Sequence, residues 1–197
     1  MSIVIGLTGP TGAGKSSVAQ TVASMGIKVV DCDVVARRAV ERGSDGLSAV
    51  VSAFGDGILL PDGTLDRKEL ARRAFSSAEK TELLNRTLLP HIVEMVKCEA
   101  GDGDVLLDAP TLFESGMDSV CTQTVAVLAD RDVRRDRIIS RDGLTIEEAD
   151  IRMNAGKPDA FYLERAGHIL YNNGDGTEFI TAAAALMNKL FGGNQNE

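Results

Sequence analysis

Short apolar runs recur along the chain and predict the strands of a parallel sheet. Most are rich in β-branched residues or leucine and lack polar alternation, which is typical of strands covered on both faces. They are Ile3–Leu7, Lys28–Val30, Val105–Leu107, Thr124–Leu128 and His168–Leu170. Because helical patterns lie between these runs, the sequence predicts a three-layer α/β fold with a five-stranded parallel sheet.

Helices are predicted from apolar spacing and from capping signals. Val18 and Val22 recur at helical spacing after the first predicted strand, and Gly26 is placed to end that helix. Capping-box patterns at Asp66–Glu69 and Thr145–Glu148 predict two further helix starts.

Two intervals between predicted strands are longer than a crossover connection requires. The first lies between Val30 and Val105 and far exceeds a single crossover helix, and the second lies between Leu128 and His168. Ligands of open α/β sheets bind beyond the carboxyl ends of the strands. We therefore expect both intervals to form helical covers that exclude water from a binding site.

A glycine-rich motif follows the first predicted strand. Residues Gly9–Ser16 read GPTGAGKS and fit the pattern G-x-x-x-x-G-K-[ST] without a gap. The glycines let backbone N–H groups approach phosphate oxygens, and the helix that follows directs its positive end at the same charge. In this P-loop pattern Lys15 reaches the β- and γ-phosphates of ATP, and the Ser16 hydroxyl is placed to ligate Mg²⁺.

The motif predicts ATP and Mg²⁺ as ligands. The alternative interpretation of the motif is a glycine-rich turn that only joins the strand to the helix. The residues of this segment that we expect to contact the nucleotide are Gly9, Thr11, Gly12, Ala13, Gly14, Lys15, Ser16 and Ser17.

Two carboxylates follow the second predicted strand. Alternation places Asp31 and Asp33 on one side of the extended chain, at the sheet edge that the glycine-rich motif shares. Phosphoryl transfer to a hydroxyl needs a carboxylate that orients the hydroxyl and accepts its proton. We favour Asp33 as that base and Asp31 as a residue that supports the site from behind or binds a water of Mg²⁺. Alternatively, one of the two caps the following helix.

A third carboxylate, Asp108, closes the third predicted strand in the segment VLLDAP. An apolar strand that ends in aspartate is typical of the second carboxylate on the metal side of P-loop enzymes. A turn at Asp108–Pro110 is the alternative interpretation. We name Ser16 and Asp108 as candidate metal ligands, and the choice between Asp31 and Asp108 beside Mg²⁺ stays open.

Arginines cluster after the fourth predicted strand. They are Arg131, Arg134, Arg135, Arg137 and Arg141. On a helix Arg134, Arg137 and Arg141 share one face, which can close over the nucleotide and neutralise charge on the transferred phosphoryl group. Interleaved aspartates make a solvated helix of ion pairs the alternative. The position beside the strand ends favours a lid.

Composition narrows the classes of function. The 197 residues carry a formal net charge of −8, which disfavours nucleic-acid binding because phosphate contacts need a basic face. Three scattered cysteines disfavour a disulfide framework. Because the sequence shows no secretory signal and no apolar run of the ~20 residues that span a bilayer, we expect a cytoplasmic protein with no membrane partner.

The order of these motifs resembles that of the dephospho-coenzyme A kinases. The matching blocks are GLTGPTGAGKSSVA, GIKVVDCDVVAR, DGTLDRKELARRAF, LLDAPTLFE, the pair Arg137 and Arg141, and NNG at Asn172–Gly174. The resemblance implies transfer of the γ-phosphoryl group of ATP to the ribose 3′-hydroxyl of dephospho-coenzyme A, with Mg²⁺. That reaction is the last step of coenzyme A synthesis.

The resemblance also assigns roles to residues and segments. The residues with implied catalytic roles are Asp33, Lys15, Arg141 and Arg137, and Asn173 joins the nucleotide contacts. A single P-loop kinase domain is implied over residues 1–197, with a helical acceptor-binding insertion at about 37–99 and a lid at about 131–160. We expect ATP and dephospho-coenzyme A as partners of a monomer or weak homo-oligomer.

The chain departs from the family pattern at four positions. Leu89, Thr111, Gly156 and Gly167 stand where the family usually has His, Leu, Gln and Asp. Two alternatives therefore stay open. The first is another small-molecule P-loop kinase, acting on a nucleoside, a sugar or a shikimate-like alcohol. The second is a nucleotide-binding homologue without turnover.

Overall fold

A five-stranded sheet lies at the centre of the computed structural model, which describes residues 2–192. Its strands are β1 (Val4–Thr8), β2 (Lys28–Asp31), β3 (Val105–Asp108), β4 (Gln123–Leu128) and β5 (His168–Tyr171). All neighbours pair in parallel, in the order β2-β3-β1-β4-β5. No bound of a predicted strand is displaced by more than one residue. The predicted α/β fold with five parallel strands is confirmed.

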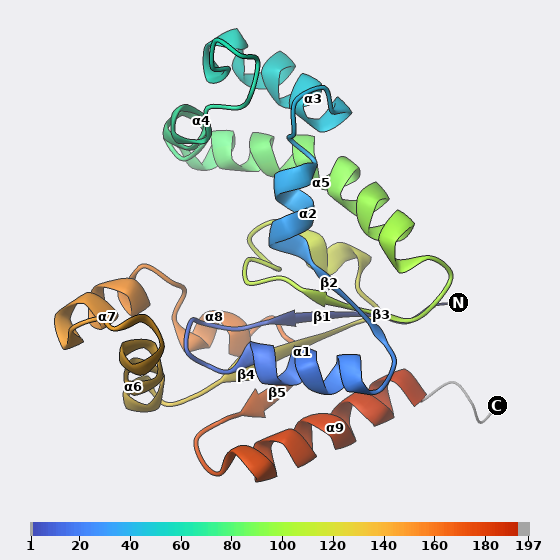
Figure 1. Ribbon diagram of the computed structural model, residues 1–197, viewed down its shortest axis with the longest axis vertical. Coiled ribbons are helices and arrows are strands. Elements are labelled where there is room, and N and C mark those ends of the chain that lie inside the picture. Colours follow the sequence, from blue (N-terminus) through green and yellow to red (C-terminus); the bar gives the residue numbers. More distant parts are fainter. Residues whose placement is uncertain (1, 193–197) are drawn as a thin grey trace.

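Helices cover both faces of this sheet. Those of the described residues are α1 (Lys15–Ser24), α2 (Cys32–Arg38), α3 (Asp45–Phe54), α4 (Arg67–Ala74), α5 (Ala78–Ala100), α6 (Arg131–Asp142), α7 (Ile146–Asn154), α8 (Asp159–Leu163) and α9 (Gly176–Gly192). Short 3₁₀ turns occupy Asp56–Ile58 and Met117–Val120. Figure 1 shows α1 and α9 on one face of the sheet, with α2 and α5 on the other side. Val18 and Val22 of α1 are fully buried against Phe179 and Met187 of α9.

The first long interval folds into a helical tip, formed by α3, α4 and the first half of α5, that stands away from the sheet (Figure 1). Ser44, Asp66 and Ser77 cap its three helices through their side chains. The tip has an apolar cluster of its own, whose buried members are Val40, Val50, Ile58, Leu70 and Ala74.

The long helix α5 connects this tip to the sheet, and Pro90 lies inside it. Before the proline, Leu84 packs against the cluster of the tip, and after it Ile92 and Val96 pack against the core beside the sheet. Because proline has no N–H group, the carbonyl of Arg86 lacks its usual helical donor at this point.

The two predicted capping boxes differ in outcome. Thr145 and Glu148 form both reciprocal bonds, since the Thr145 hydroxyl accepts from the Glu148 N–H and the Glu148 carboxylate accepts from the Thr145 N–H. Asp66 caps α4 by accepting from the N–H of Glu69, 3.0 Å away. The Glu69 carboxylate does not return the bond and pairs with Arg72 at 2.7 Å instead. This capping box is therefore half formed.

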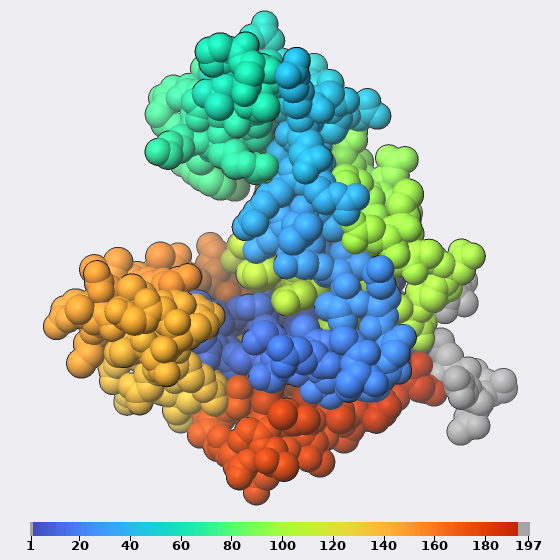
Figure 2. All heavy atoms as spheres, in the orientation of Figure 1, coloured from blue at the N-terminus to red at the C-terminus, as the bar shows by residue number. Residues whose placement is uncertain are grey.

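The second long interval forms α6 and α7, which pack on each other through Ile138, Ala149 and Met153. Figure 2 shows the molecule hollowed between these helices (orange) and the side formed by α2 and the helical tip (blue to green). Asp31 and Asp108 are register partners on β2 and β3, and Leu7 of β1 is also a partner of Asp108. The carboxyl ends of these strands therefore meet beside the hollow.

Candidate active site

The hollow contains a cleft of about 1300 Å³ at the carboxyl ends of the strands. Its walls come from the glycine-rich loop, the ends of α2 and β3, the helices α6 and α7, and the start of α9. The predicted site residues that line it are Gly9, Thr11, Gly12, Gly14, Lys15, Ser16, Ser17, Asp33, Asp108, Arg137 and Arg141. Ala13 and Asn173 do not line it. Residues from both ends of the chain thus converge on one cavity.

The glycine-rich loop has a backbone that only glycine adopts readily. Gly12 and Gly14 have φ of 79° and 103°, in the left-handed region that is strained for other residues. A Cβ at Gly12 would lie 2.7 Å from the carbonyl oxygen of Arg134 on α6. Helix α1 begins directly after the loop, at Lys15, and no side chain caps its start. Its first N–H groups are therefore available to an anion in the cleft.

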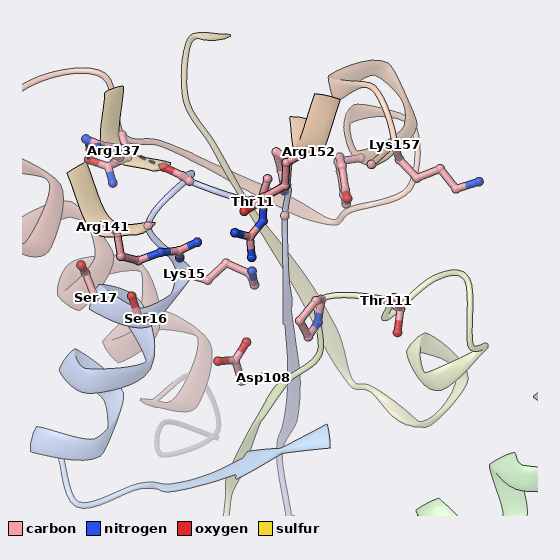
Figure 3. A pocket seen from close by; sticks show the side chains of 18 of the residues that line it. Thr11, Lys15, Ser16, Ser17, Asp108, Thr111, Arg137, Arg141, Arg152 and Lys157 are labelled. Carbon is pink, nitrogen blue, oxygen red and sulfur yellow. Dashed lines mark hydrogen bonds between the residues drawn. The ribbon is translucent and has the colours of Figure 1, made fainter. Parts of the chain in front are cut away.

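Lys15 and Asp108 are the charged groups at the base of the cleft. Burial lowers the pKa of the Lys15 ammonium, while the carboxylates of Asp108 and Asp33 oppose this shift. Burial raises the pKa of Asp108, the Lys15 charge opposes the shift, and the Asp31 and Asp33 charges add to it. Figure 3 shows the Asp108 carboxylate directed toward the space below the Lys15 ammonium.

The two aspartates after Val30 have separate positions. Asp31 is the N-cap of α2, where its Oδ1 accepts from the N–H groups of Asp33 at 2.9 Å and Val34 at 3.1 Å. The Asp33 side chain lines the cleft and is exposed. Capping therefore engages Asp31, and of the two aspartates only Asp33 lines the cleft.

Ser16 and Asp108 were the predicted metal ligands, and the structure permits a test of their fit to Mg²⁺. Both line the cleft, and the buried Oδ1 of Asp108 has no hydrogen-bond partner among the described residues. Residues 2–192 contain no cluster of three or more His, Cys, Asp or Glu suited to a metal. Mg²⁺ binds through one or two protein oxygens and completes its shell with water and phosphate oxygens. The pair therefore fits Mg²⁺ bound together with a nucleotide.

The arginines of α6 do not form the single cleft-facing row that their spacing predicts. Arg134 is buried and pairs with Asp159 at 3.2 Å. Arg137 donates to the carbonyls of Gly12 at 3.5 Å and Ala13 at 3.4 Å. Arg141 lines the cleft farther along the helix. Only Arg137 and Arg141 of the row reach the cleft, because α6 packs its Arg134 side against the body of the protein.

Asn172, rather than its neighbour Asn173, lies at the cleft. The Asn172 side chain donates to the carbonyl of Ala13 at 2.8 Å and accepts from Arg137 at 3.1 Å. Asn173 accepts from the N–H of Asp130 at 2.7 Å and donates to its carboxylate at 2.9 Å. Asn173 therefore does not line the cleft, and its contact with the nucleotide stays a prediction. Alternation after the buried Leu170 and exposed Tyr171 would have indicated Asn172 as the inward residue.

Sequence reasoning missed several cleft residues that lie outside the glycine-rich loop and outside α6. They are Glu114, Arg152, Lys157 and Tyr162. The buried Oε2 of Glu114 has no hydrogen-bond partner among the described residues. Burial, with the Glu114 charge second, raises the pKa of Tyr162 to about 12, so its hydroxyl stays protonated. The one sequence feature that could have indicated Glu114 as a cleft residue is its position at the end of the block LLDAPTLFE.

The four departures from the family pattern fall in different places. Thr111 and Gly156 line the cleft. Leu89 is half-buried against the core beside the sheet. The Gly167 N–H donates to the Thr124 hydroxyl at 2.9 Å, at the start of β5 and away from the strand ends that form the cleft. Two of the four can therefore influence what the cleft binds.

Comparisons with known proteins agree with this geometry. The family model described as dephospho-CoA kinase matches residues 3–178. A protein of Geobacillus kaustophilus named dephospho-CoA kinase is 36% identical over 193 residues, which cover 95% of this chain and 96% of the relative. No helix among residues 2–192 has the length and hydropathy to cross a membrane.

Solved structures show the same fold. A Thermus thermophilus structure aligns with a TM-score of 0.73 at 33% identity and covers 96% of this chain and 98% of its own. The dephospho-CoA kinase of Campylobacter jejuni aligns with a TM-score of 0.64 at 22% identity and covers 99% of this chain and 100% of its own. Since the family model spans residues 3–178 and the relatives match along most of the chain, the chain belongs to the dephospho-CoA kinase family.

Proposed function

We propose that the chain transfers the γ-phosphoryl group of ATP to the ribose 3′-hydroxyl of dephospho-coenzyme A, giving coenzyme A and ADP. The observation that carries the proposal is the shared cleft, which the glycine-rich loop, Lys15 and Asp33 all line. Phosphoryl transfer depends mainly on positioning and on charge stabilisation, and this cleft supplies both kinds of group. Family membership supports the identity of the two substrates.

The donor nucleotide lies along the glycine-rich loop. Backbone N–H groups at the start of α1 and the Lys15 ammonium hold the β- and γ-phosphates. Lys15 and Arg141 both place positive charge in the cleft, although the protein carries net negative charge overall, and a bound phosphate relieves the repulsion between them. Arg137 and Asn172 support the loop through the carbonyl of Ala13. Arg141 contributes most when charge spreads over the transferred group.

Asp33 orients the acceptor hydroxyl and accepts its proton as the bond to phosphorus forms. The proton passes from the 3′-hydroxyl oxygen to an Asp33 carboxylate oxygen, and ADP leaves with the electrons of the broken P–O bond. Asp31 keeps the start of α2 in place through its two capping bonds, and thereby sets the position of the base.

Mg²⁺ is part of the proposal, with Ser16 and Asp108 as its protein ligands. The ion supplies neutralisation of phosphate charge when bound. Asp108 rather than Asp31 is the carboxylate beside it, because Asp108 lines the cleft with a free Oδ1 while Asp31 is engaged in capping.

The acceptor lies on the side of the cleft away from the glycine-rich loop. We assign residues of about 37–99, which include the helical tip, to the acceptor-binding insertion, and residues of about 131–160 to the lid. We assign Glu114 and Tyr162, which line the cleft outside the glycine-rich loop, to the acceptor, because the unpartnered Oε2 of Glu114 needs a donor such as a hydroxyl or an amine.

The cell compartment and the assembly state complete the proposal. All three cysteines are free thiols, which supports a cytoplasmic location, where thiols stay reduced. For the assembly state we propose a monomer or weak homo-oligomer. Sedimentation of the purified protein would measure the assembly state.

One assay tests the function. Purified protein is given ATP, Mg²⁺ and a panel of alcohols that includes dephospho-coenzyme A, a nucleoside, a sugar and shikimate. ADP release is followed and each product is identified by mass. We expect turnover with the coenzyme precursor only. Turnover with another acceptor would assign the cleft to a different small-molecule kinase, a result that Thr111 and Gly156 in its wall would help to explain. Nucleotide binding without any turnover would contradict a transferase.

A further inference from the structure

Two arginines from different lid helices share one carboxylate beside the cleft. The Nε and one terminal nitrogen of Arg141, on α6, each donate to the Asp142 carboxylate at 2.8 Å. Arg152, on α7, donates at 2.6 Å to Oδ2 of Asp142, the oxygen that also accepts from the terminal nitrogen of Arg141. Arg141 is thus held in a bidentate pair and Arg152 is held next to it.

Both guanidinium groups belong to the cleft wall, whereas Asp142 does not line the cleft. Figure 3 shows Lys15, Arg141 and Arg152 directed into the same part of the cavity, above Asp108. Two guanidinium groups that share one carboxylate leave one net positive charge on this group of three side chains. An anion held between Lys15 and the lid would therefore meet two guanidinium groups rather than one.

We propose that Arg152 is a second lid cation for the transferred phosphoryl group and that Asp142 is the positioning residue that holds Arg141 and Arg152 as a pair. The inference rests on the proposed function and adds a residue that neither the motif nor the arginine spacing of α6 indicated.

The physical reason lies in the freedom of long side chains. An unrestrained arginine loses considerable rotamer entropy when it is fixed against a phosphate. The Asp142 carboxylate removes much of that freedom in advance, and it fixes the spacing of two groups that α6 and α7 carry separately. Preorganised charge of this kind acts where charge develops in the transition state.

A second ion pair between the same helices provides a matched control. Arg131 on α6 donates to Asp150 on α7 at 2.9 Å, and neither residue lines the cleft. Asp142→Asn and Asp150→Asn therefore each remove one interhelical carboxylate charge of the lid. If Asp142 served only to join α6 to α7, the two substitutions would have similar effects.

Steady-state kinetics of Asp142→Asn, Asp150→Asn and Arg152→Ala test the proposal. We expect Asp142→Asn to lower kcat by roughly 10-fold to 10²-fold with little change in the KM of ATP, as misplacement of a positioned group does. Asp150→Asn should stay near wild type. Arg152→Ala should lower kcat as well, and the double variant Asp142→Asn/Arg152→Ala should lose less than the product of the single losses. Asp142→Glu, which keeps the charge, should retain more activity than Asp142→Asn.

Equal effects of Asp142→Asn and Asp150→Asn would overturn the positioning role, as would an unchanged or higher kcat in Asp142→Asn. If the kcat loss of the double variant equalled the product of the single losses, Arg152 and Asp142 would act independently, and the proposal that Asp142 positions Arg152 would be wrong. Thermal unfolding of all variants checks that each one folds.

A binding measurement keeps this inference distinct from the proposed function. Calorimetry with ADP, Mg²⁺ and aluminium fluoride, a mimic of the transferred phosphoryl group, needs no acceptor. Asp142→Asn should weaken this complex and leave the affinity for ADP alone unchanged. If the wild-type protein turned over no acceptor, the proposed function would fail. The difference in aluminium fluoride binding between wild type and Asp142→Asn would still test whether Asp142 positions the two arginines.

Discussion

Lys15 and Asp108 face the same part of the cleft, and the charge of each opposes the shift that burial imposes on the pKa of the other. The two residues come from the helix after β1 and from the end of β3, which are neighbouring strands. Burial remains the larger influence on both groups. Because burial disfavours the charged form of both side chains, a ligand with opposite charges for each, such as a phosphate with its Mg²⁺, would stabilise the pair.

The raised pKa of Asp108 predicts a trade between stability and activity. A carboxyl whose pKa is raised on folding favours the folded state most at pH below its ordinary pKa, and the contribution is lost as pH rises through the raised value. At neutral pH the Asp108 charge therefore opposes folding. We expect Asp108→Asn to raise the free energy of unfolding by about 1 kcal/mol near pH 7 and to lower kcat by roughly 10²-fold.

Denaturant unfolding at neutral pH and at about pH 4 measures the first effect, because the advantage of the variant should shrink when the wild-type carboxyl is protonated. A variant less stable than wild type at neutral pH would show that the charge of Asp108 stabilises the fold.

The different positions of Asp31 and Asp33 predict different consequences of substitution. Asp33→Asn should lower kcat by roughly 10²–10⁴-fold while ATP still binds, because a general base contributes on that scale. Asp31→Ala should instead cost about 1 kcal/mol of stability, because it removes an N-cap, and should affect kcat less. Parallel measurement of turnover, ATP binding and thermal unfolding separates the two. Near-normal turnover in Asp33→Asn would remove that residue from the mechanism.

The adjacent asparagines supply a second matched comparison. Asn172→Ala should raise the KM of ATP and cost about 1–3 kcal/mol of stability, because it removes two buried hydrogen bonds, one to the Ala13 carbonyl and one from Arg137. Asn173→Ala loses bonds to Asp130 at an exposed position, so its KM of ATP should remain closer to wild type. The reverse order of the two KM values would return the nucleotide contact to Asn173.

Substitution of Glu114 should change the KM of the acceptor and leave the KM of ATP unchanged. Its unpartnered Oε2 lies in the cleft wall, and a hydrogen bond from the acceptor to a charged group is worth roughly 1.5–3 kcal/mol. Glu114→Gln should therefore raise the KM of dephospho-coenzyme A about 10-fold or more, with the KM of ATP unchanged. Thr111→Ser serves as a conservative control on the same loop. A rise in the KM of ATP alone would place Glu114 on the donor side.

The sheet and the phosphate loop were predictable because their signals are local. Buried strands need short continuous apolar runs, and the left-handed residues of the loop at Gly12 and Gly14 need glycine. The helical tip and the lid were also indicated, since the intervals between the strands are too long for crossovers. The sequence pattern sufficed wherever an element is defined by its own residues.

The contacts within the cleft were less predictable, because partners distant in sequence decide them. Asn172 and Asn173 are identical side chains, and only the packing of β5 beside the glycine-rich loop turns one of them inward. Arg134 follows the same spacing as Arg137 and Arg141, yet Asp159 of α8 draws it into the interior. Arg152 lines the cleft because α7 packs against α6, a contact that the sequence pattern does not indicate.

The proline within α5 has a consequence for how the molecule tolerates change. The missing backbone bond at Pro90 lies where α5 passes from one cluster to the other: Leu84 packs on the outer cluster, Leu88 on both clusters, and Ile92 and Val96 on the core beside the sheet. Since the outer cluster contributes no residue to the glycine-rich loop, substitutions that keep that cluster filled should leave the grip on the triphosphate unchanged.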